Sequence, residues 1–200
     1  MQNKRVAILG ANGQVGSELA LLMSLSKTLK PIAIARSSYS LALLKKLGIK
    51  CFVARNTDEL KNILSRCDAA VELVHPWHEN IKKMKEVIVE RCKVINSSLP
   101  KDSPIIYCST KSIYNEDPNI PKFTLYGNTK LFAEEQFRKM GKIYNKKVCI
   151  LRLGEVHGAM QGCTLSLMSS IKKNRMVRVP NMLSNTVFVS SIEESINQFI

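Results

Sequence analysis

VAILGANGQVG, at residues 6–16, is the segment that decides the fold. Its apolar start is typical of a buried strand, and glycines spaced G-x-x-G-x-x-G lead into a helical pattern over residues 14–26. We expect Gly10 to allow a tight turn, Gly13 to present bare backbone to a pyrophosphate, and Gly16 to let the helix pack closely on the strand. The helix start offers unpaired N–H groups and a positive dipole end to a diphosphate. A purely structural glycine-rich turn is the alternative.

Short apolar runs alternate with helical patterns along the rest of the chain. This alternation predicts an α/β fold with a doubly wound parallel sheet of Rossmann type, covered by helices on both faces. Strands are expected at residues 6–9, 31–35, 51–53, 69–74, 105–108 and 148–151, and helices at 14–26, 38–47, 57–65, 78–92 and 125–140. Such sheets bind ligands beyond the carboxyl ends of their strands, near the switch point in strand order.

The chain is strongly basic, with 30 Lys and Arg against 16 Asp and Glu and a formal net charge of +14. This excess attracts anions, whether nucleic acid, a membrane surface or a phosphorylated small molecule. The basic residues form short clusters without interleaved aromatic rings, which favours a solvated basic surface over a nucleic-acid site. We therefore expect a small-molecule substrate, itself anionic, as the partner.

Neither a membrane segment nor a signal peptide is predicted, because the apolar runs are far shorter than the ~20 residues of a membrane span. The cysteines are scattered, and no pair has metal-ligand or redox-motif spacing; they are Cys51, Cys67, Cys92, Cys108, Cys149 and Cys163. We expect reduced thiols in a cytoplasmic protein, and no metal site.

The end of the second expected strand indicates which dinucleotide binds. An acidic residue there would bind the ribose 2′-hydroxyl of NAD and repel a 2′-phosphate. Arg36 stands at this place instead, followed by Ser37. A guanidinium can pair a 2′-phosphate with two hydrogen bonds, so the sequence favours NADP over NAD. The alternative is a surface arginine in a basic chain.

Tyr126 and Lys130 are four residues apart in the long expected helix, so their side chains emerge on the same face. A neighbouring ammonium stabilises a phenolate and lowers the pKa of the phenol, which makes proton exchange with a substrate hydroxyl or carbonyl feasible. Thr110 ends the strand before this helix and can hydrogen-bond the substrate oxygen. A solvated helix face is the alternative reading of the Tyr-Lys pair.

Motifs along the chain resemble those of one enzyme family. The matching segments, in the family's order, are GANGQVG at 10–16, CSTKSIYN at 108–115, YGNTK at 126–130 and LRLGEVHG at 151–158. The chain resembles the extended short-chain dehydrogenases/reductases, the NAD(P)-dependent epimerase/dehydratase family. The resemblance implies a single NAD(P)-binding Rossmann-type domain over residues 1–200, with a reduced C-terminal substrate-side lobe at 153–185.

The resemblance also implies roles for single residues. Thr110 would position the substrate oxygen, Tyr126 would exchange the proton, and Lys130 would tune Tyr126 and hold the nicotinamide ribose. The implied cofactor-binding residues are Gly10, Asn12, Gly13, Gln14, Val15 and Gly16 at the pyrophosphate, Arg36 with Ser37 at the 2′-phosphate, Val74 at the ribose, and Leu153 and Val156 near the nicotinamide. A late strand and helix within 185–196 would return to the sheet.

The family's sugar dehydratases carry Asp-Glu after the threonine, where this chain has Lys111 and Ser112, so dehydratase activity is not expected. We expect an NADP-dependent oxidoreductase or epimerase that acts on a carbonyl or secondary alcohol, with sugars and sugar nucleotides as candidate substrates. A sensor or scaffold protein that binds NADP without turnover is the alternative, and nucleic-acid binding is the least favoured. Long helices of this family often pair, so a homodimer is compatible with the resemblance.

Overall fold

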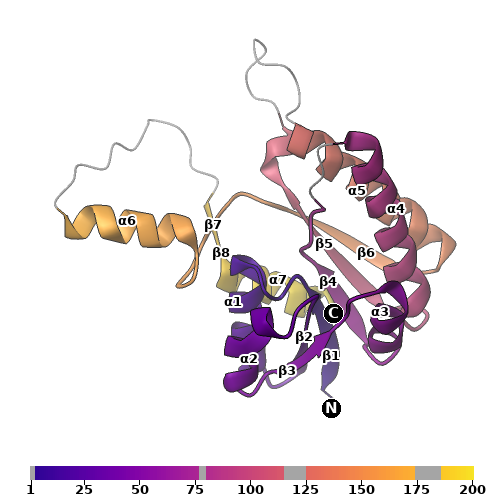
Figure 1. Ribbon diagram of the computed structural model, residues 1–200, viewed down its shortest axis with the longest axis horizontal. Coiled ribbons are helices and arrows are strands. Elements are labelled where there is room, and N and C mark those ends of the chain that lie inside the picture. The colour runs from indigo at the N-terminus through magenta and orange to yellow at the C-terminus, as the bar shows by residue number, and fades with distance from the viewer. Residues whose placement is uncertain (1–2, 77–79, 115–124, 174–185) are drawn as a thin grey trace, which may run out of the picture.

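A six-stranded sheet, in which all neighbouring strands run parallel, forms the centre of the structure (Figure 1). The computed structural model describes residues 3–76, 80–114, 125–173 and 186–200. The strands are β1 (Lys4–Leu9), β2 (Leu29–Ala35), β3 (Lys50–Val53), β4 (Ala69–Glu72), β5 (Pro104–Thr110) and β6 (Lys147–Leu153). Their order, β3-β2-β1-β4-β5-β6, places the switch point between β1 and β4 and confirms the predicted doubly wound sheet.

Helices cover both faces of the sheet (Figure 1). One face carries α1 (Gln14–Ser24), α2 (Ala42–Lys46) and α7 (Val189–Phe199), and the other carries α3 (Thr57–Leu64), α4 (Ile81–Ser98) and α5 (Leu125–Ile143). In β1, Val6 and Ile8 join the core on the α1 face, while Ala7 and Leu9 join the core on the α4 face. A strand buried on both faces reads as a continuous apolar run, which is why the sequence pattern predicted it.

Most predicted elements differ from the structure by a few residues at their ends. β4 ends at Glu72 and not at residue 74, because the Glu72 carboxylate accepts a hydrogen bond from the Val74 N–H at 2.6 Å. α4 begins at Ile81, where the Asn80 side chain accepts hydrogen bonds from the first-turn N–H groups and caps the helix. Residues 78 and 79, with which the helix was expected to begin, lie outside the described residues. The helix expected at 38–47 is a 3₁₀ turn at Tyr39–Leu41 followed by the short α2.

The C-terminal part differs most from expectation. β8 (Thr186–Phe188) does not return to the main sheet but pairs in parallel with β7 (Glu155–His157) as a separate two-stranded sheet. α7 does return, and its apolar face joins the core beside α1. α6 (Gly162–Lys172), for which no helix was predicted, buries none of its residues and projects from the sheet (Figure 1). Residues 174–185 of the expected lobe lie outside the described residues.

In the parts of the chain that the structure describes, every helix is too short or too polar for a membrane span.

A buried carboxylate joins α5 to β6. Glu134 is fully buried and pairs with Arg152 at 2.8 Å and with Arg138 at 2.9 Å. Arg152 also donates a hydrogen bond to the hydroxyl of Tyr114, so the network reaches the segment after β5. Burial opposes ionisation of Glu134, but hydrogen bonds led by those from Arg152 hold its pKa below the ordinary value.

Replacing Glu134 with glutamine tests this network. A carboxyl whose pKa is lower in the folded state stabilises the protein above its unfolded pKa and loses that effect as the pH falls. We expect Glu134→Gln to lower the free energy of unfolding at neutral pH by about 1–3 kcal/mol. The difference from the wild type should shrink as the pH falls below the ordinary glutamate value of 4.5, in denaturant titrations. Glu135→Gln, on the exposed side of α5, is the matched control. Equal loss in both variants would contradict a role for the network.

Candidate functional site

The glycine turn after β1 adopts the conformation expected from its sequence. Gly10 has a φ of +86°, in the left-handed region that favours glycine. The N–H of Gly10 donates to Ile34 O at 3.2 Å, and the N–H of Gly13 donates to Gly10 O at 2.9 Å. A Cβ at Gly10 would lie 3.1 Å from a methyl group of Val74. The turn is therefore fixed between β2 and the end of β4.

The third glycine brings α1 into direct contact with this turn. A Cβ at Gly16 would lie 2.3 Å from Gly10 O and 2.9 Å from the Cα of Ala11, so only glycine fits without a backbone shift. Gly13 is the N-cap of α1, and no side chain caps this end. Since the first N–H groups of a helix have no partner within it, the start of α1 presents donors at the carboxyl edge of the sheet.

Two neighbouring cavities lie along this edge. The Arg36 cavity, of about 440 Å³, contains the predicted residues Gly10, Asn12, Gly13, Arg36, Ser37 and Val74 in its wall. The Tyr126 cavity, of about 330 Å³, contains Gly10, Gly13, Gln14, Val15, Gly16, Thr110, Tyr126, Lys130, Leu153 and Val156. Gly10, Gly13 and Leu73 line both cavities. The structure thus brings every site residue predicted from the sequence to one cleft that has the glycine turn at its middle.

Lys130 is a buried cation beneath the Tyr126 cavity. Its side chain is 3% exposed, and its Nζ donates a hydrogen bond to Cys108 O at 2.8 Å. The same Nζ lies 4.9 Å from the centroid of the Tyr107 ring and 5.8 Å from that of Tyr126. Burial lowers the pKa of Lys130, while the Cys108 and Glu72 side chains oppose this shift.

The pKa of Tyr126 is shifted upward, opposite to the lowering expected from the neighbouring Lys130. Burial raises the pKa of the phenol, although the residue keeps 38% exposure toward the cleft. The Lys130 ammonium lies beside the Tyr126 ring and donates its hydrogen bond to the Cys108 carbonyl. Its charge therefore does not outweigh the effect of burial on the phenol. The tyrosine is a neutral phenol at neutral pH in this arrangement.

Thr110 ends β5 and presents its hydroxyl to the same cavity. Its Oγ1 accepts a hydrogen bond from the Ser112 N–H at 3.1 Å, which caps the 3₁₀ turn at Lys111–Ile113. The hydroxyl also lies 3.1 Å from the Ser112 hydroxyl, to which it donates. These two contacts fix the orientation of the threonine side chain.

His75, which belongs to none of the sequence motifs, is a neighbour of Tyr126. Its ring meets the Tyr126 ring edge-on, with centroids 4.8 Å apart, and its Nε2 lies 3.2 Å from the hydroxyl of Thr129. Burial, with a smaller effect of Lys130, lowers the pKa of His75 to about 4, so the ring is neutral at neutral pH. In the sequence, only the position of His75 just after the fourth strand indicated that it could lie near the site.

Arg91 is a second cation in the wall of the Arg36 cavity, and no sequence motif indicated it. Its guanidinium pairs with the buried carboxylate of Glu72 at 2.6 Å. Burial raises the pKa of Glu72, and the pairing with Arg91 opposes that shift. The pair places a positive side chain from α4 next to the strand ends.

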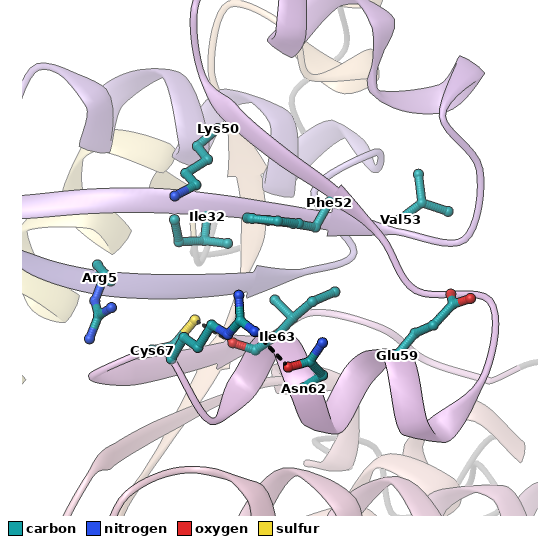
Figure 2. Close-up of a pocket in the computed structure, with 10 residues that line it drawn as sticks. Arg5, Ile32, Lys50, Phe52, Val53, Glu59, Asn62, Ile63 and Cys67 are labelled. Carbon is teal, nitrogen blue, oxygen red and sulfur yellow. Dashed lines mark hydrogen bonds between the residues drawn. The ribbon is translucent and has the colours of Figure 1, made fainter.

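A further cavity of about 280 Å³ lies between β3 and α3 (Figure 2). Figure 2 shows Lys50 and Phe52 on the strand side and Asn62 on the helix opposite. Arg66 donates to the Asn62 amide oxygen at 3.1 Å, and Arg5 pairs with Asp68. None of the predicted site residues lines this cavity, so we do not assign the main function to it.

Comparisons with known proteins agree with the fold. The model of the NAD dependent epimerase/dehydratase family matches residues 6–186. Solved structures with the same fold include UDP-N-acetylglucosamine 4-epimerase from Bacillus cereus, with 16% identity, a TM-score of 0.77, and coverage of 98% of this chain and 70% of that one. UDP-glucuronic acid 4-epimerase from Bacillus cereus, solved with UDP-glucuronic acid and NAD, has 16% identity, a TM-score of 0.72, and coverage of 96% and 72%.

The chain is less similar in structure to triphenylmethane reductase from Citrobacter sp., which was solved with NADP(H). Its identity is 16% and its TM-score 0.59, with coverage of 76% of this chain and 50% of that one. A search of curated proteins finds no significant match.

The contact between α1 and the glycine turn can be tested by stability measurements. We expect Gly16→Ala to lower the free energy of unfolding by about 1–3 kcal/mol, because the new methyl group meets backbone atoms that cannot rotate away. Gly13→Ala is the matched control, since a Cβ there has its nearest neighbour, Gly10 O, at 3.3 Å. Chemical denaturation compares the two variants. A smaller effect for Gly16→Ala than for Gly13→Ala would contradict the packing described above.

Proposed function

We propose, given that the chain belongs to the NAD dependent epimerase/dehydratase family, that it is an NADP-dependent oxidoreductase or epimerase acting on a carbonyl or secondary alcohol. The observation that carries this proposal is the meeting of Thr110, Tyr126 and Lys130 in a cavity that adjoins the glycine turn. The residues named from the sequence keep their proposed roles, with one change: burial, and not Lys130, determines the direction in which the pKa of Tyr126 shifts.

The residues of the cleft fit a nicotinamide dinucleotide. The bare backbone of Gly13 and the uncapped start of α1 would hold the pyrophosphate. Arg36 and Ser37, at the end of β2, would hold an adenosine 2′-phosphate, with Val74 near the ribose. Leu153 and Val156 would line the nicotinamide end. The cofactor, when bound, supplies the hydride donor or acceptor.

Tyr126 is suited to donate a proton. Its raised pKa keeps the phenol protonated at neutral pH, so it can protonate the oxygen of a carbonyl as that carbonyl is reduced. The buried Lys130 ammonium would stabilise the phenolate that remains. Thr110 would hold the substrate oxygen in place by turning its hydroxyl proton from Ser112 to the substrate. In the reverse direction, the phenolate would accept the proton of a secondary alcohol.

The proposed substrate is anionic, with sugar nucleotides as the first candidates. The net charge of +14 would favour such a molecule, and the two epimerases compared above have names that specify UDP-sugar substrates. Dehydration is not proposed, because Lys111 and Ser112 follow Thr110 and bring no carboxylate to that place.

The preference for the phosphorylated dinucleotide can be measured directly. We expect NADPH to bind more tightly than NADH, and Arg36→Ala to weaken NADPH binding by about tenfold or more while changing NADH binding little. Arg66→Ala removes an arginine outside the cleft and is the matched control. Fluorescence titration of the reduced cofactors gives both affinities. Equal binding of the two cofactors, unchanged in Arg36→Ala, would refute the assignment of Arg36.

Replacing the phenol hydroxyl tests turnover. We expect Tyr126→Phe to reduce the rate with a responsive UDP-sugar or carbonyl substrate by about 10²–10⁴-fold while cofactor affinity stays close to that of the wild type. Tyr144→Phe, at the far end of α5, should leave the rate unchanged. Net NADPH consumption would indicate a reductase, and interconversion of two sugars without net consumption an epimerase.

Cofactor binding with no turnover of any carbonyl or UDP-sugar, in the wild type as in Tyr126→Phe, would support a sensor or scaffold protein instead.

A further inference from the structure

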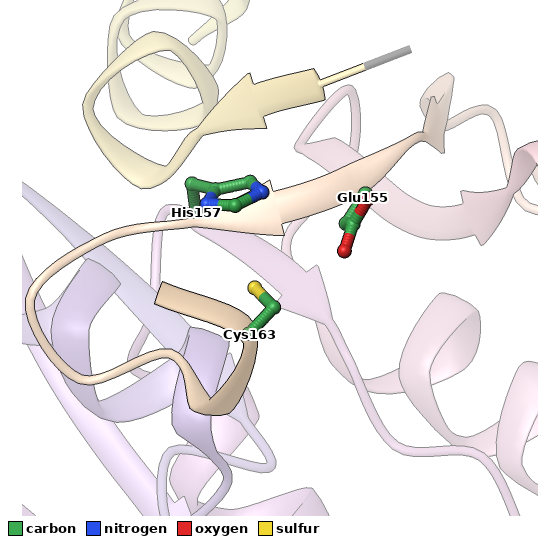
Figure 3. Close-up of side chains that lie close together, drawn as sticks. All are labelled: Glu155, His157 and Cys163. Carbon is green, nitrogen blue, oxygen red and sulfur yellow. The ribbon is translucent and has the colours of Figure 1, made fainter. Parts of the chain in front are cut away.

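Three side chains with metal-binding atoms lie close together outside the cleft, near the two-stranded sheet of β7 and β8. Glu155 and His157 occupy alternate positions on β7 and therefore share one face of that strand. Cys163 lies at the start of α6, which follows β7 in the chain. Figure 3 shows the Cys163 thiol at the start of α6 pointing toward β7, on which Glu155 and His157 lie. One ligand atom from each lies within 4.8 Å of the others.

Hydrogen bonds orient the histidine of this cluster. The Nδ1 of His157 lies 3.1 Å from the hydroxyl oxygen of Thr164, and the same oxygen accepts the N–H of Gly158 at 3.1 Å. The Thr164 oxygen can accept both bonds when Nδ1 carries the ring proton, and in that tautomer Nε2 keeps its lone pair. Metal-binding histidines are commonly held in this way through the nitrogen that does not bind the metal.

The thiol is available for coordination. Cys163 is a half-buried free cysteine, and its Sγ donates a hydrogen bond to Val156 O at 2.8 Å. This contact is local and aims the sulfur at the strand that carries Glu155 and His157. Binding of a thiophilic cation would release the thiol proton to solvent and replace this hydrogen bond with a metal–sulfur bond.

We infer that Glu155, His157 and Cys163 form a zinc site. A mixed set of sulfur, nitrogen and oxygen donors suits Zn²⁺, whereas Mg²⁺ and Ca²⁺ prefer oxygen alone. Ligand atoms around a tetrahedral zinc ion lie about 3.5 Å apart, so the side chains need to close by roughly 1 Å. The thiolate and the carboxylate together neutralise the dication, and the fourth position stays open to water or to another ligand.

The site would fasten α6 to β7. α6 buries none of its residues, so apolar packing contributes little to holding its first turn in place. A metal bound to both β7 and Cys163 would cross-link the helix start to the strand. Val156, between the two ligands on β7, faces the Tyr126 cavity, so the cross-link would also fix one wall of the cleft. This inference does not depend on the proposed reaction.

Zinc affinity, measured by competition with a chromophoric chelator, tests the inference. We expect the purified chain to bind one equivalent of Zn²⁺, and Cys163→Ser or His157→Gln to weaken binding by more than about 100-fold. Thr164→Val, which removes the support of the histidine, should weaken it by about 10- to 100-fold. Cys149→Ser, on β6 and outside the cluster, is the matched control.

Cobalt gives an independent readout of the ligands. Co²⁺ bound at this site should produce a sulfur-to-cobalt charge-transfer band that Cys149→Ser retains and Cys163→Ser loses. Far-ultraviolet circular dichroism of each variant shows whether it is folded. Absence of stoichiometric zinc binding by the wild type would overturn the inference, as would zinc affinity unchanged in folded Cys163→Ser and His157→Gln.

Discussion

The close approach of α1 to the turn after β1 is the constraint on which the rest of the structure depends. A single methyl group at Gly16 would lie 2.3 Å from Gly10 O, so this contact requires glycine at position 16, and Gly10 supplies the left-handed backbone of the turn. The approach aims the uncapped start of α1 at the switch point between β1 and β4. Both cavities of the cleft meet at this turn, which makes the glycines the common wall of the proposed cofactor site.

The same helix also holds the loop that follows β7. Glu18, buried on α1, accepts hydrogen bonds from the N–H groups of Ala159 and Met160 at 2.8 and 3.0 Å and from the Gln161 side chain at 2.8 Å. A Cβ at Gly158 would lie 2.3 Å from the Glu18 carboxylate, so this contact is also close. α1 therefore positions the glycine turn at its start and the loop after β7 one turn later.

The sequence predicted the buried strands and the glycine turn, because each depends on the residue types within one short segment. Continuous apolar runs marked the strands buried on both faces, and the glycine spacing marked the turn. β7 and β8 are three residues each, too short for a periodic signal, and α6 has no buried face to produce one. The contact of His75 with Tyr126 joins segments far apart in the chain, and the raised pKa of Tyr126 depends on burial. The cysteine spacing indicated no metal site, and it carries no information on the approach of Cys163 to Glu155 and His157, which depends on the packing of α6 beside β7.

Nuclear magnetic resonance of the ¹⁵N-labelled protein during titration with NADPH tests the central claim most directly. We expect the amide signals of Gly10, Gly13 and Gly16 to shift together with those of Arg36 and Lys130, since these residues line the two halves of one cleft. Saturating shifts confined to Lys50, Phe52 and Asn62, around the cavity between β3 and α3, would contradict it. The absence of any saturable shift would contradict it equally.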